Sequence, residues 1–415
     1  MIGAGSIVLC REALPPLSVL EREWRRIEGS GQPSFFISWH WIGTLLVAVP
    51  KMRRPMLLRG HADGDTVALA LLGANQTRRR SGLVRSRSLY LNETGDPHFD
   101  SPMIEHNAVL TAVGYETAVW EALLSWFAGL GGEVDELYLR GSRLRLPETA
   151  VEARGLTRNE TMLPSYSVDL DRLKESGGEL YPVLSANARQ QLRRTFRYFE
   201  QFGPLRLSAP ATVTEALTYF NSMKALHCTS WERRGEPHSF AGEFFEPFHR
   251  LLIERSFAEG GIQLLRACAG ERVVGYLYNF RLGNRVYAYQ SGFDDADRRE
   301  RPGILTHALA IKHAFETGAR VYDFMAGRNR LKESFATCCE PMLWQVVQQP
   351  RLVFRLEKLG LQIRHALAQS VDPVRPRPTR KRVPWEERKD TARPCAPGLA
   401  GPLDCQEPGV ICPSY

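Results

Sequence analysis

The sequence lacks an apolar run long enough to cross a bilayer, which takes about 20 residues. The nearest candidate, FFISWHWIGTLLVAV (35–49), is uncharged but holds 15 residues and includes His40. It predicts a buried helix, with contact to a membrane surface or an apolar substrate as the alternative. The N-terminus also lacks the basic and long apolar regions of a signal peptide. We therefore expect a cytoplasmic protein.

Cysteine is present, but not in metal-binding spacing. Eight cysteines occur, none as a CxxC pair, and Cys338 and Cys339 are adjacent. Structural zinc sites and disulfide frameworks need regularly spaced cysteines. We expect no metal and no disulfide framework.

The body of the chain lacks an excess of charge of one sign. Residues 350–394 hold twelve Lys or Arg against five Asp or Glu, a net charge of +7, and residues 395–415 add only Asp404 and Glu407, a net of −2. The first 349 residues therefore keep only +3 of the total +8. A broad polyanion-binding surface needs more positive charge than this. We expect no nucleic-acid partner for the body. The basic tail either stays solvated or makes peripheral contact with an anionic membrane.

Helical and strand periodicities alternate along the 415 residues, a length typical of two domains. The first part predicts helices at 18–28, 35–49 and 115–130, a hairpin at 55–74 and a strand at 134–141. The second predicts capping boxes at Asn187 and Thr212, a helix at 244–261, three strands over 262–294, and strands at 319–325 and 342–349. The two parts repeat one order of elements, which indicates a diverged tandem duplication. We predict domains at 1–165 and 166–349, an amphipathic helix at 350–371 and a basic, Pro/Arg-rich disordered tail at 372–415.

A charged run ends at Arg301-Pro302-Gly303, and a helical pattern follows at once. Free N–H groups at a helix start bind phosphate, proline needs no donor in the first turn, and glycine permits close approach. The same residues also suit an ordinary helix start. Three strands before this helix and one after it give the order of elements expected of an acyl-CoA site.

The segments RVVGYLYNF, VYAYQSGFD and RPGILTHALAIKHAFETGARVYDFMAGRNRLKESF resemble the CelD/BcsL-like family of the Gcn5-related N-acetyltransferase (GNAT) superfamily. LHCTSWERRG (226–235) and FFISWHWIGTLL fit the same family. The resemblance covers roughly residues 35–345. It implies an α/β (α+β) fold of two GNAT-like lobes, each a mixed, mostly antiparallel sheet flanked by helices, with a degenerate N-terminal lobe.

The resemblance also implies a set of donor-binding residues. Arg301, Gly303, Ile304 and Leu305 would line the pyrophosphate loop of acetyl-CoA, and Tyr289, Gln290 and Ser291 would lie beside the thioester. The loop is poorer in glycine than the superfamily pattern Q/R-x-x-G-x-G/A. FemX-like aminoacyltransferases, which use aminoacyl-tRNA, share this abbreviated form.

Acyl transfer needs a base for the acceptor, donors for the carbonyl oxygen and an acid for the leaving group. Candidates for these roles are Asp323, His307 and Tyr289. Each has a structural alternative: a paired buried carboxylate, a polar contact on a helix and a core tyrosine.

Four further residues are candidates for substrate binding. His227 and Trp231 lie four apart on a predicted helix and share a face, which suits either an acceptor pocket or core packing. Arg328 and Lys332 follow the strand at 319–325 and suit either an anionic group or a solvated loop.

The sequence thus predicts an acyl-CoA-dependent N- or O-acyltransferase. The family's association with cellulose and exopolysaccharide production makes a sugar, amino sugar or polysaccharide precursor the expected acceptor. The alternatives are a FemX-like aminoacyltransferase and a non-enzymatic scaffold of two GNAT lobes.

Overall fold

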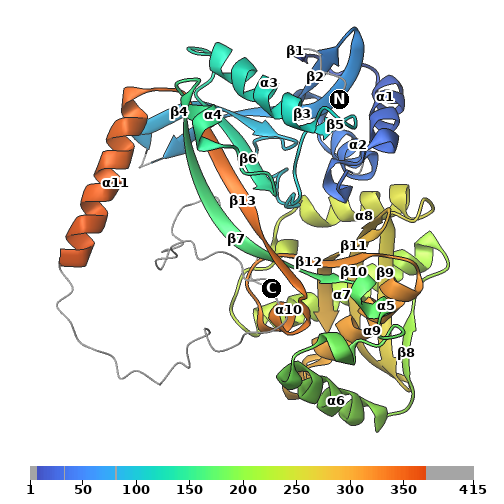
Figure 1. Ribbon diagram of the computed structural model, residues 1–415. Helices are drawn as coiled ribbons and strands as arrows, with labels where there is room; N and C mark the ends of the chain where they lie inside the picture. Colours follow the sequence, from blue (N-terminus) through green and yellow to red (C-terminus); the bar gives the residue numbers. More distant parts are fainter. Residues whose placement is uncertain (1–6, 32, 80–81, 371–415) are drawn as a thin grey trace.

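A computed structural model describes residues 7–31, 33–79 and 82–370 (Figure 1). The predicted disordered tail, 372–415, lies outside these residues. The elements of the first part are β1 (Val8–Glu12), α1 (Leu17–Ser30), α2 (Trp39–Ala48), β2 (Met56–Ala62), β3 (Asp65–Arg79), β4 (Val84–Leu91), β5 (Leu110–Thr111), α3 (Glu116–Gly129), β6 (Glu136–Ser142) and α4 (Glu148–Glu152). The predicted hairpin is confirmed: Asp63 and Gly64 join β2 to β3, both with the positive φ that a two-residue hairpin turn requires.

The second part contains more helices between its strands. Its elements are β7 (Thr157–Asp169), α5 (Asp171–Lys174), α6 (Ala186–Glu200), β8 (Leu205–Ser208), α7 (Val213–Glu232), α8 (Phe245–Ser256), β9 (Ile262–Ala269), β10 (Arg272–Leu282), β11 (Arg285–Phe293), α9 (Pro302–Glu316), β12 (Val321–Ala326), α10 (Arg330–Phe335), β13 (Cys338–Gln348) and α11 (Leu352–Ser370). The three strands predicted over 262–294 are β9, β10 and β11, and the strands predicted at 319–325 and 342–349 are β12 and β13.

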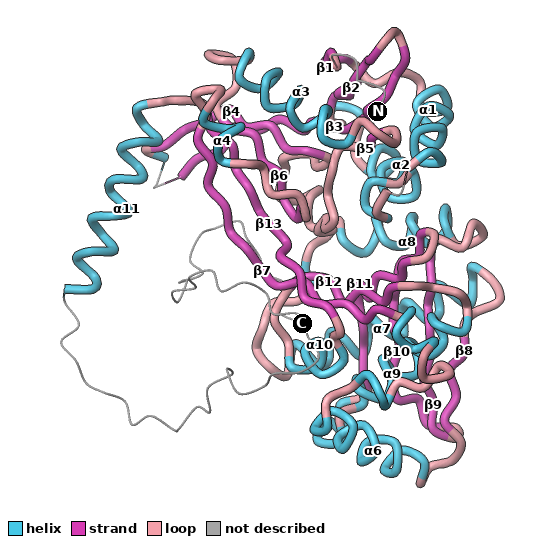
Figure 2. Tube along the Cα trace, in the orientation of Figure 1, coloured by secondary structure: helices cyan, strands magenta, loops and turns pink. Residues whose placement is uncertain are grey.

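One 13-stranded mixed sheet runs through the molecule in the order β1-β2-β3-β4-β6-β13-β7-β12-β11-β10-β9-β8, and the thirteenth strand, β5, pairs with β3 outside this order. Its pairs are antiparallel except β4–β6 and β11–β12. The long strands β7 and β13 pair along their whole length and connect the upper and lower parts of the sheet (Figure 2). The predicted mixed, mostly antiparallel α/β architecture is confirmed. The predicted domain boundary, 165/166, falls inside β7 and stays a prediction.

Helices cover both faces of the lower sheet. Ile304 and Ile311 of α9 lie in one core with Leu192 of α6. The opposite face carries α7 and α8, which share a core with α1 and α2. There Trp41 of α2 packs on Phe248 of α8, with ring centroids 4.9 Å apart. The aromatic segment 35–49 is therefore buried, as predicted, and it joins the two parts of the chain.

Of the two predicted capping boxes, the structure confirms one and contradicts the other. Thr212 Oγ1 accepts a hydrogen bond from Glu215 N (3.2 Å), as predicted. The prediction for Asn187 is wrong, because α6 begins at Ala186 and its N-cap is Ser185, whose Oγ accepts from Ala188 N. Serine is one of the residues favoured at an N-cap, and the Ser185 hydroxyl oxygen fills this role two residues before Asn187.

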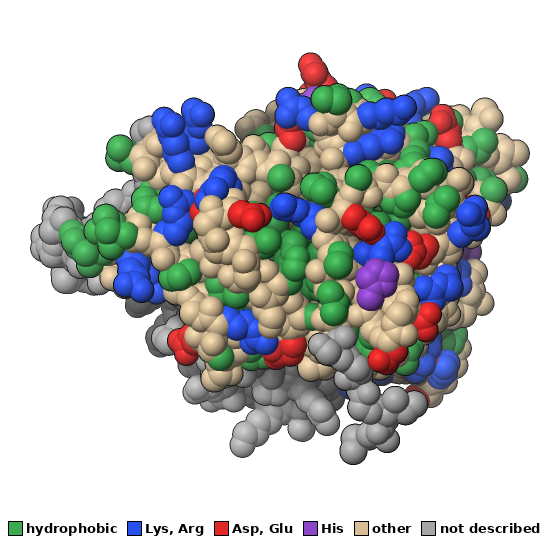
Figure 3. Space-filling model, turned by 90° about the horizontal axis from the view of Figure 1, so that it is seen from above, with side chains coloured by type: hydrophobic (Ala, Val, Ile, Leu, Met, Phe, Trp, Pro, Cys, Tyr) green, Lys and Arg blue, Asp and Glu red, His purple; other side chains and the backbone are tan. Residues whose placement is uncertain are grey.

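Helix α11 extends away from the body at the left of Figure 1. The space-filling view in Figure 3 shows hydrophobic side chains beside basic ones at the left of the molecule. Its most exposed apolar residues follow helical spacing: Leu352, Leu356, Leu359 and Ile363. Arg79 joins the helix to the sheet, since it contacts Glu357 (3.1 Å) and the buried Glu136 (2.9 Å). Among the described helices, none is long and apolar enough to span a membrane.

Candidate functional site

Strands β11 and β12 diverge in the middle of the sheet. They pair in parallel only where Arg285–Tyr287 lies beside Val321–Asp323. Beyond Tyr287, β11 continues to Phe293 paired with β10 alone, while β12 ends with Ala326 opposite Ser165 of β7. The edge of β11 over residues 288–293 is thus open toward β12, which creates a gap inside an otherwise continuous sheet.

Helix α7 closes one side of this gap because Gly292 lets it approach. A Cβ atom at Gly292 would lie 2.2 Å from the backbone oxygen of Met223 and 3.1 Å from the backbone nitrogen of His227. The close packing brings the His227 ring to β11, where Nδ1 lies 2.9 Å from the Ser291 carbonyl oxygen. His227 is 4% exposed, and its ring lies 5.5 Å from that of Trp231.

A cavity of about 100 Å³ occupies the gap. Its walls come from both helical layers, with His227 and Trp231 of α7 on one side and His307 of α9 on the other. Residues 288–293 of β11 form its floor, and Phe324, Asn329, Leu331 and Lys332 complete it. The cavity is therefore bordered by elements from both faces of the sheet.

A larger groove of about 720 Å³ adjoins the cavity at the start of α9. Arg234, Phe293, Asn329 and Leu331 line both hollows, so the two adjoin, and they are called the channel below. Further groove residues are Ser185, Asn187, Arg298, Arg301, Pro302, Gly303, Ile304 and Arg330.

The N-terminus of α9 faces this groove without a side-chain cap. Arg301 is the N-cap residue and adopts the left-handed conformation (φ 61°), which is uncommon for a residue other than glycine. Pro302 follows at the first helical position, as predicted. Pro302 has no N–H and Ile304 N donates to the Arg301 carbonyl oxygen (2.9 Å), so the Gly303 amide, the positive end of the helix dipole and three nearby guanidinium groups make this end of the groove suitable for phosphate.

Gly303 is required by packing rather than by its backbone angles. A Cβ atom there would lie 3.0 Å from Leu331 Cδ1 and 3.1 Å from Phe293 Cε2. These two side chains line both the groove and the cavity, so a side chain at position 303 would press on the wall that the two hollows share.

His307 and Tyr289 both reach the cavity wall. His307 Nδ1 lies 2.9 Å from the Tyr322 hydroxyl, and burial lowers the pKa of His307 to about 3, so the ring is neutral. Tyr289 is 3% exposed and packs against Phe280, with centroids 4.5 Å apart. Both residues thus combine a core position with a share of the cavity lining.

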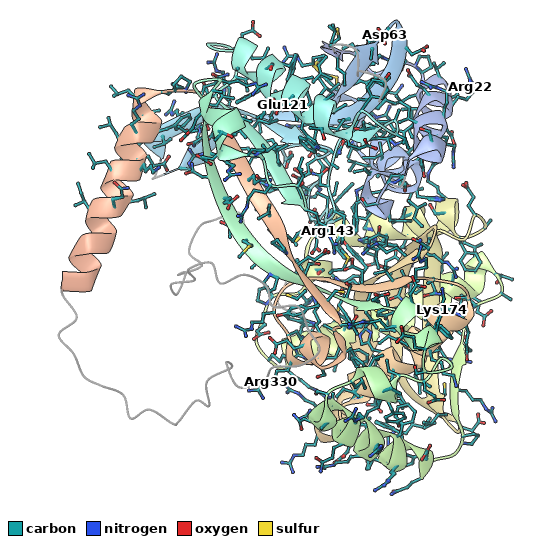
Figure 4. All side chains as sticks on the ribbon, in the orientation of Figure 1. Arg22, Asp63, Glu121, Arg143, Lys174 and Arg330 are labelled. Atoms are coloured by element: carbon teal, nitrogen blue, oxygen red, sulfur yellow. The ribbon has the colours of Figure 1, made fainter. Side chains whose placement is uncertain are left out.

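Asp323 is fully buried outside the cavity and the groove, in an ionic cluster where the two parts of the chain meet. Its Oδ2 lies 2.7 Å from Arg285, 3.3 Å from Arg143 and 3.2 Å from His106. Its Oδ1 accepts from Met325 N (2.9 Å). Burial opposes ionisation of Asp323, but His106 and the two arginines hold its pKa well below the ordinary value. Figure 4 shows Arg143 at this junction.

Lys332 connects the ionic cluster with the cavity. Its ammonium group donates to the carbonyl oxygens of Ala326 (2.6 Å) and Met325 (3.3 Å). Glu105, from the first part of the chain, accepts from Ala326 N (2.8 Å). Burial lowers the pKa of Lys332 to about 8, against the opposing charges of Glu105 and Asp323.

Comparison with known proteins identifies the central part of the chain. Residues 186–333 match the acetyltransferase (GNAT) domain family. This segment runs from the start of α6 into α10 and includes β8 to β12, so it contains every residue of the channel except Ser185 and Ser334. No curated protein matches the chain. The finer resemblance to the CelD/BcsL-like family stays a prediction.

Solved structures share the fold at low identity. FemX aligns over 83% of this chain and 98% of its own, with 10% identity and a TM-score of 0.54. A tandem GNAT protein from the clavulanic acid biosynthesis pathway aligns over 83% of this chain and 99% of its own, with 12% identity and a TM-score of 0.41. At 10% identity the likeness to FemX concerns the fold alone.

The segment that matches the acetyltransferase (GNAT) family brings together most of the predicted site residues. The cavity is lined by Tyr289, Gln290, Ser291, His227, Trp231, His307 and Lys332, and the groove by Arg301, Gly303 and Ile304. Three candidates lie elsewhere: Asp323 in the ionic cluster, Leu305 fully buried in the core beside Phe199, and Arg328 on the surface, paired with Glu333 (2.8 Å). Their predicted roles stay untested.

Two residues that line the channel, Arg234 and Asn329, were not predicted from the sequence. Arg234 borders both hollows, stacks over Trp231 and donates to Ser230 Oγ (2.8 Å). Its position in WERRG, about one helical turn after Trp231, could have indicated that it lies on the same side as Trp231. Asn329 caps α10 by accepting from Leu331 N. In the part of the chain that the structure describes, no cluster of His, Cys, Asp or Glu is arranged to hold a metal.

Proposed function

We propose that this protein is an acyl-CoA-dependent N- or O-acyltransferase with acetyl-CoA as donor. The observation that carries the proposal is the pair of adjoining hollows, a groove at the α9 N-terminus and a cavity in the gap between β11 and β12. A thioester donor consists of a charged phosphate end and a narrow acyl arm. The channel offers a cationic wide end and a narrow, mostly apolar inner end in the same order.

Different residues along the channel would bind the pyrophosphate, the pantetheine arm and the thioester. The Gly303 amide at the start of α9, with Arg298, Arg301 and Arg330, would hold the pyrophosphate. The open edge of β11 would pair with the amide groups of the pantetheine arm, because its backbone is not paired with β12 there. The thioester would then lie in the cavity among His227, Gln290 and Lys332, away from bulk water, where polar groups act most strongly.

For the acceptor we propose a sugar, an amino sugar or a polysaccharide precursor. This part rests on the resemblance of the sequence to the CelD/BcsL-like family. The acceptor would enter from the α7 side, opposite α9, since the cavity is lined from both faces of the sheet.

A second candidate donor is aminoacyl-tRNA. The observation in its favour is the basic face of α6, where Arg193, Arg194 and Arg197 border a further hollow of about 610 Å³. This face continues the groove, because Arg194 also borders a hollow that includes Arg301. Arg194 is already paired with Glu300 (3.0 Å), and the body of the chain carries little net charge, so acyl-CoA is preferred.

Calorimetric titration with acetyl-CoA and free CoA tests the proposal. We expect micromolar binding that weakens about tenfold in Arg301→Ala, since one charge-assisted hydrogen bond contributes about 1.5 kcal/mol. The matched control is Arg22→Ala, on the outer face of α1 (Figure 4), which leaves binding unchanged. Absence of binding at millimolar acetyl-CoA contradicts the acyl-CoA proposal, and tight binding of charged tRNA instead supports the alternative.

A further inference from the structure

Two polar atoms in the cavity wall are buried and lack a hydrogen-bond partner among the described residues. They are His227 Nε2 and Gln290 Oε1. Gln290 is 6% exposed, and its amide nitrogen donates to Ser239 Oγ (3.1 Å), which leaves its oxygen unpaired. A buried polar atom without a partner costs about 1–3 kcal/mol. Twelve side-chain atoms of the described residues are in this state, and these two belong to residues that line the same cavity, where a ligand can supply the missing partners.

The chemistry of that ligand follows from the His227 tautomer. The Ser291 carbonyl oxygen can only accept, so the proton of the neutral ring lies on Nδ1 and Nε2 carries a lone pair. Burial lowers the pKa of His227 to about 4, with smaller contributions from His238 and Arg234, so the ring is neutral at physiological pH. Both unpaired atoms are therefore hydrogen-bond acceptors.

We propose that His227 Nε2 and Gln290 Oε1 bind the attacking amine of the acceptor, and that His227 is its general base. The proposal rests on the acyltransferase function proposed above and adds the class of nucleophile. A primary amine can give one N–H to each acceptor, whereas a hydroxyl group has a single proton to give. The pair therefore favours N-acylation of a primary amine over O-acylation.

The proton balance of the step is complete with these groups. The amine lone pair attacks the thioester carbonyl carbon, a C–N bond forms, and the nitrogen becomes more acidic as it gains positive charge. Its proton passes to His227 Nε2, and the C–S bond breaks. The CoA thiolate takes up one proton, and His227 returns to the neutral form. Other titratable or charged groups around the cavity are Arg234 just after α7, His238, Tyr289 on β11, His307 on α9 and Lys332 on α10.

The test uses His227→Asn in the full chain. The asparagine amide can still donate to the Ser291 carbonyl from the Nδ1 position, but it offers no basic atom at Nε2. The same substitution in the first part of the chain, His61→Asn on β2, is the control. Acetyl-CoA binding is measured by calorimetry, and transfer by release of CoA thiol with glucosamine as the probe amine. The tautomer of the His227 ring is measured independently by ¹⁵N NMR of histidine-labelled wild type, with and without glucosamine.

The proposal expects a fall in kcat of about 10²–10⁴-fold in His227→Asn, with acetyl-CoA affinity and thermal stability close to those of His61→Asn. It also expects an Nδ1–H tautomer whose Nε2 resonance shifts on addition of glucosamine. Wild-type kcat in His227→Asn, or a proton on Nε2 in the wild type, overturns it. If wild type does not bind acetyl-CoA, the acyltransferase function fails, and the NMR result still decides whether this pair of atoms binds an amine.

Discussion

The contact between α7 and β11 gives the sharpest prediction about the architecture of the site. In Gly292→Ala the new Cβ atom would lie 2.2 Å from the backbone oxygen of Met223, whereas Cβ atoms are rarely found closer than 3 Å to another heavy atom. The clash involves helix backbone, so no side-chain rotation relieves it, and α7 must move by roughly 1 Å. Overpacking of this kind costs about 3 kcal/mol. The shift also separates His227 from the Ser291 carbonyl.

Thermal unfolding and acetyl-CoA transfer measure the two effects separately. We expect the Tm of Gly292→Ala to fall by about 3 °C and kcat to fall at least tenfold. Gly29→Ala in α1 is the control, because its Cβ atom meets nothing within 4 Å and alanine favours the helix. A Gly292→Ala protein with the Tm and kcat of wild type would refute the close packing of α7 on β11.

Two further predictions concern buried carboxylates. Asp323→Asn leaves Arg143 and Arg285 without their shared carboxylate, so the free energy of unfolding should fall by about 3–5 kcal/mol. The pKa of Asp323 is held below its ordinary 3.8, so this stabilisation is present above that pH and is lost in stronger acid; the Tm difference from wild type must shrink there. Unchanged stability with abolished transfer would instead assign Asp323 to the chemistry. Glu93 is the opposite case, because burial raises its pKa to about 8 although Arg140 opposes the shift. The folded chain therefore keeps a proton on Glu93 that the unfolded chain loses above about pH 4.5. The free energy of unfolding should therefore decrease between these pH values in wild type and decrease less in Glu93→Gln; parallel Tm-against-pH curves would contradict this.

The sequence predicts the elements around the site well, because they combine strong periodicity with clear turn residues. Strands β9 to β11 alternate apolar residues between glycine turns, and α9 begins at Pro302 after a charged run. Strand β7 was missed for a physical reason. Its segment TRNETMLPSYSVD is polar at the start and contains Pro164, since that half of the strand is exposed and its hydrogen-bonding partners come from β13. No local pattern announces a strand stabilised by a partner almost 180 residues away.

The same limit applies to the site residues. The sequence shows that a carboxylate among apolar neighbours, Asp323, needs partners, but not that Arg143 and His106 from the first part of the chain supply them. It shows that His227 and Trp231 share a helix face. It does not show that Gly292 brings this face to the Ser291 carbonyl, which fixes the tautomer of His227.

A crystal structure of the protein with CoA tests the central claim most directly. The account predicts the pyrophosphate at the Gly303 amide of α9 beside Arg301, the pantetheine arm along residues 288–293 of β11, and the thiol in the cavity next to His227. CoA bound elsewhere, with the gap between β11 and β12 filled by protein side chains, would contradict it.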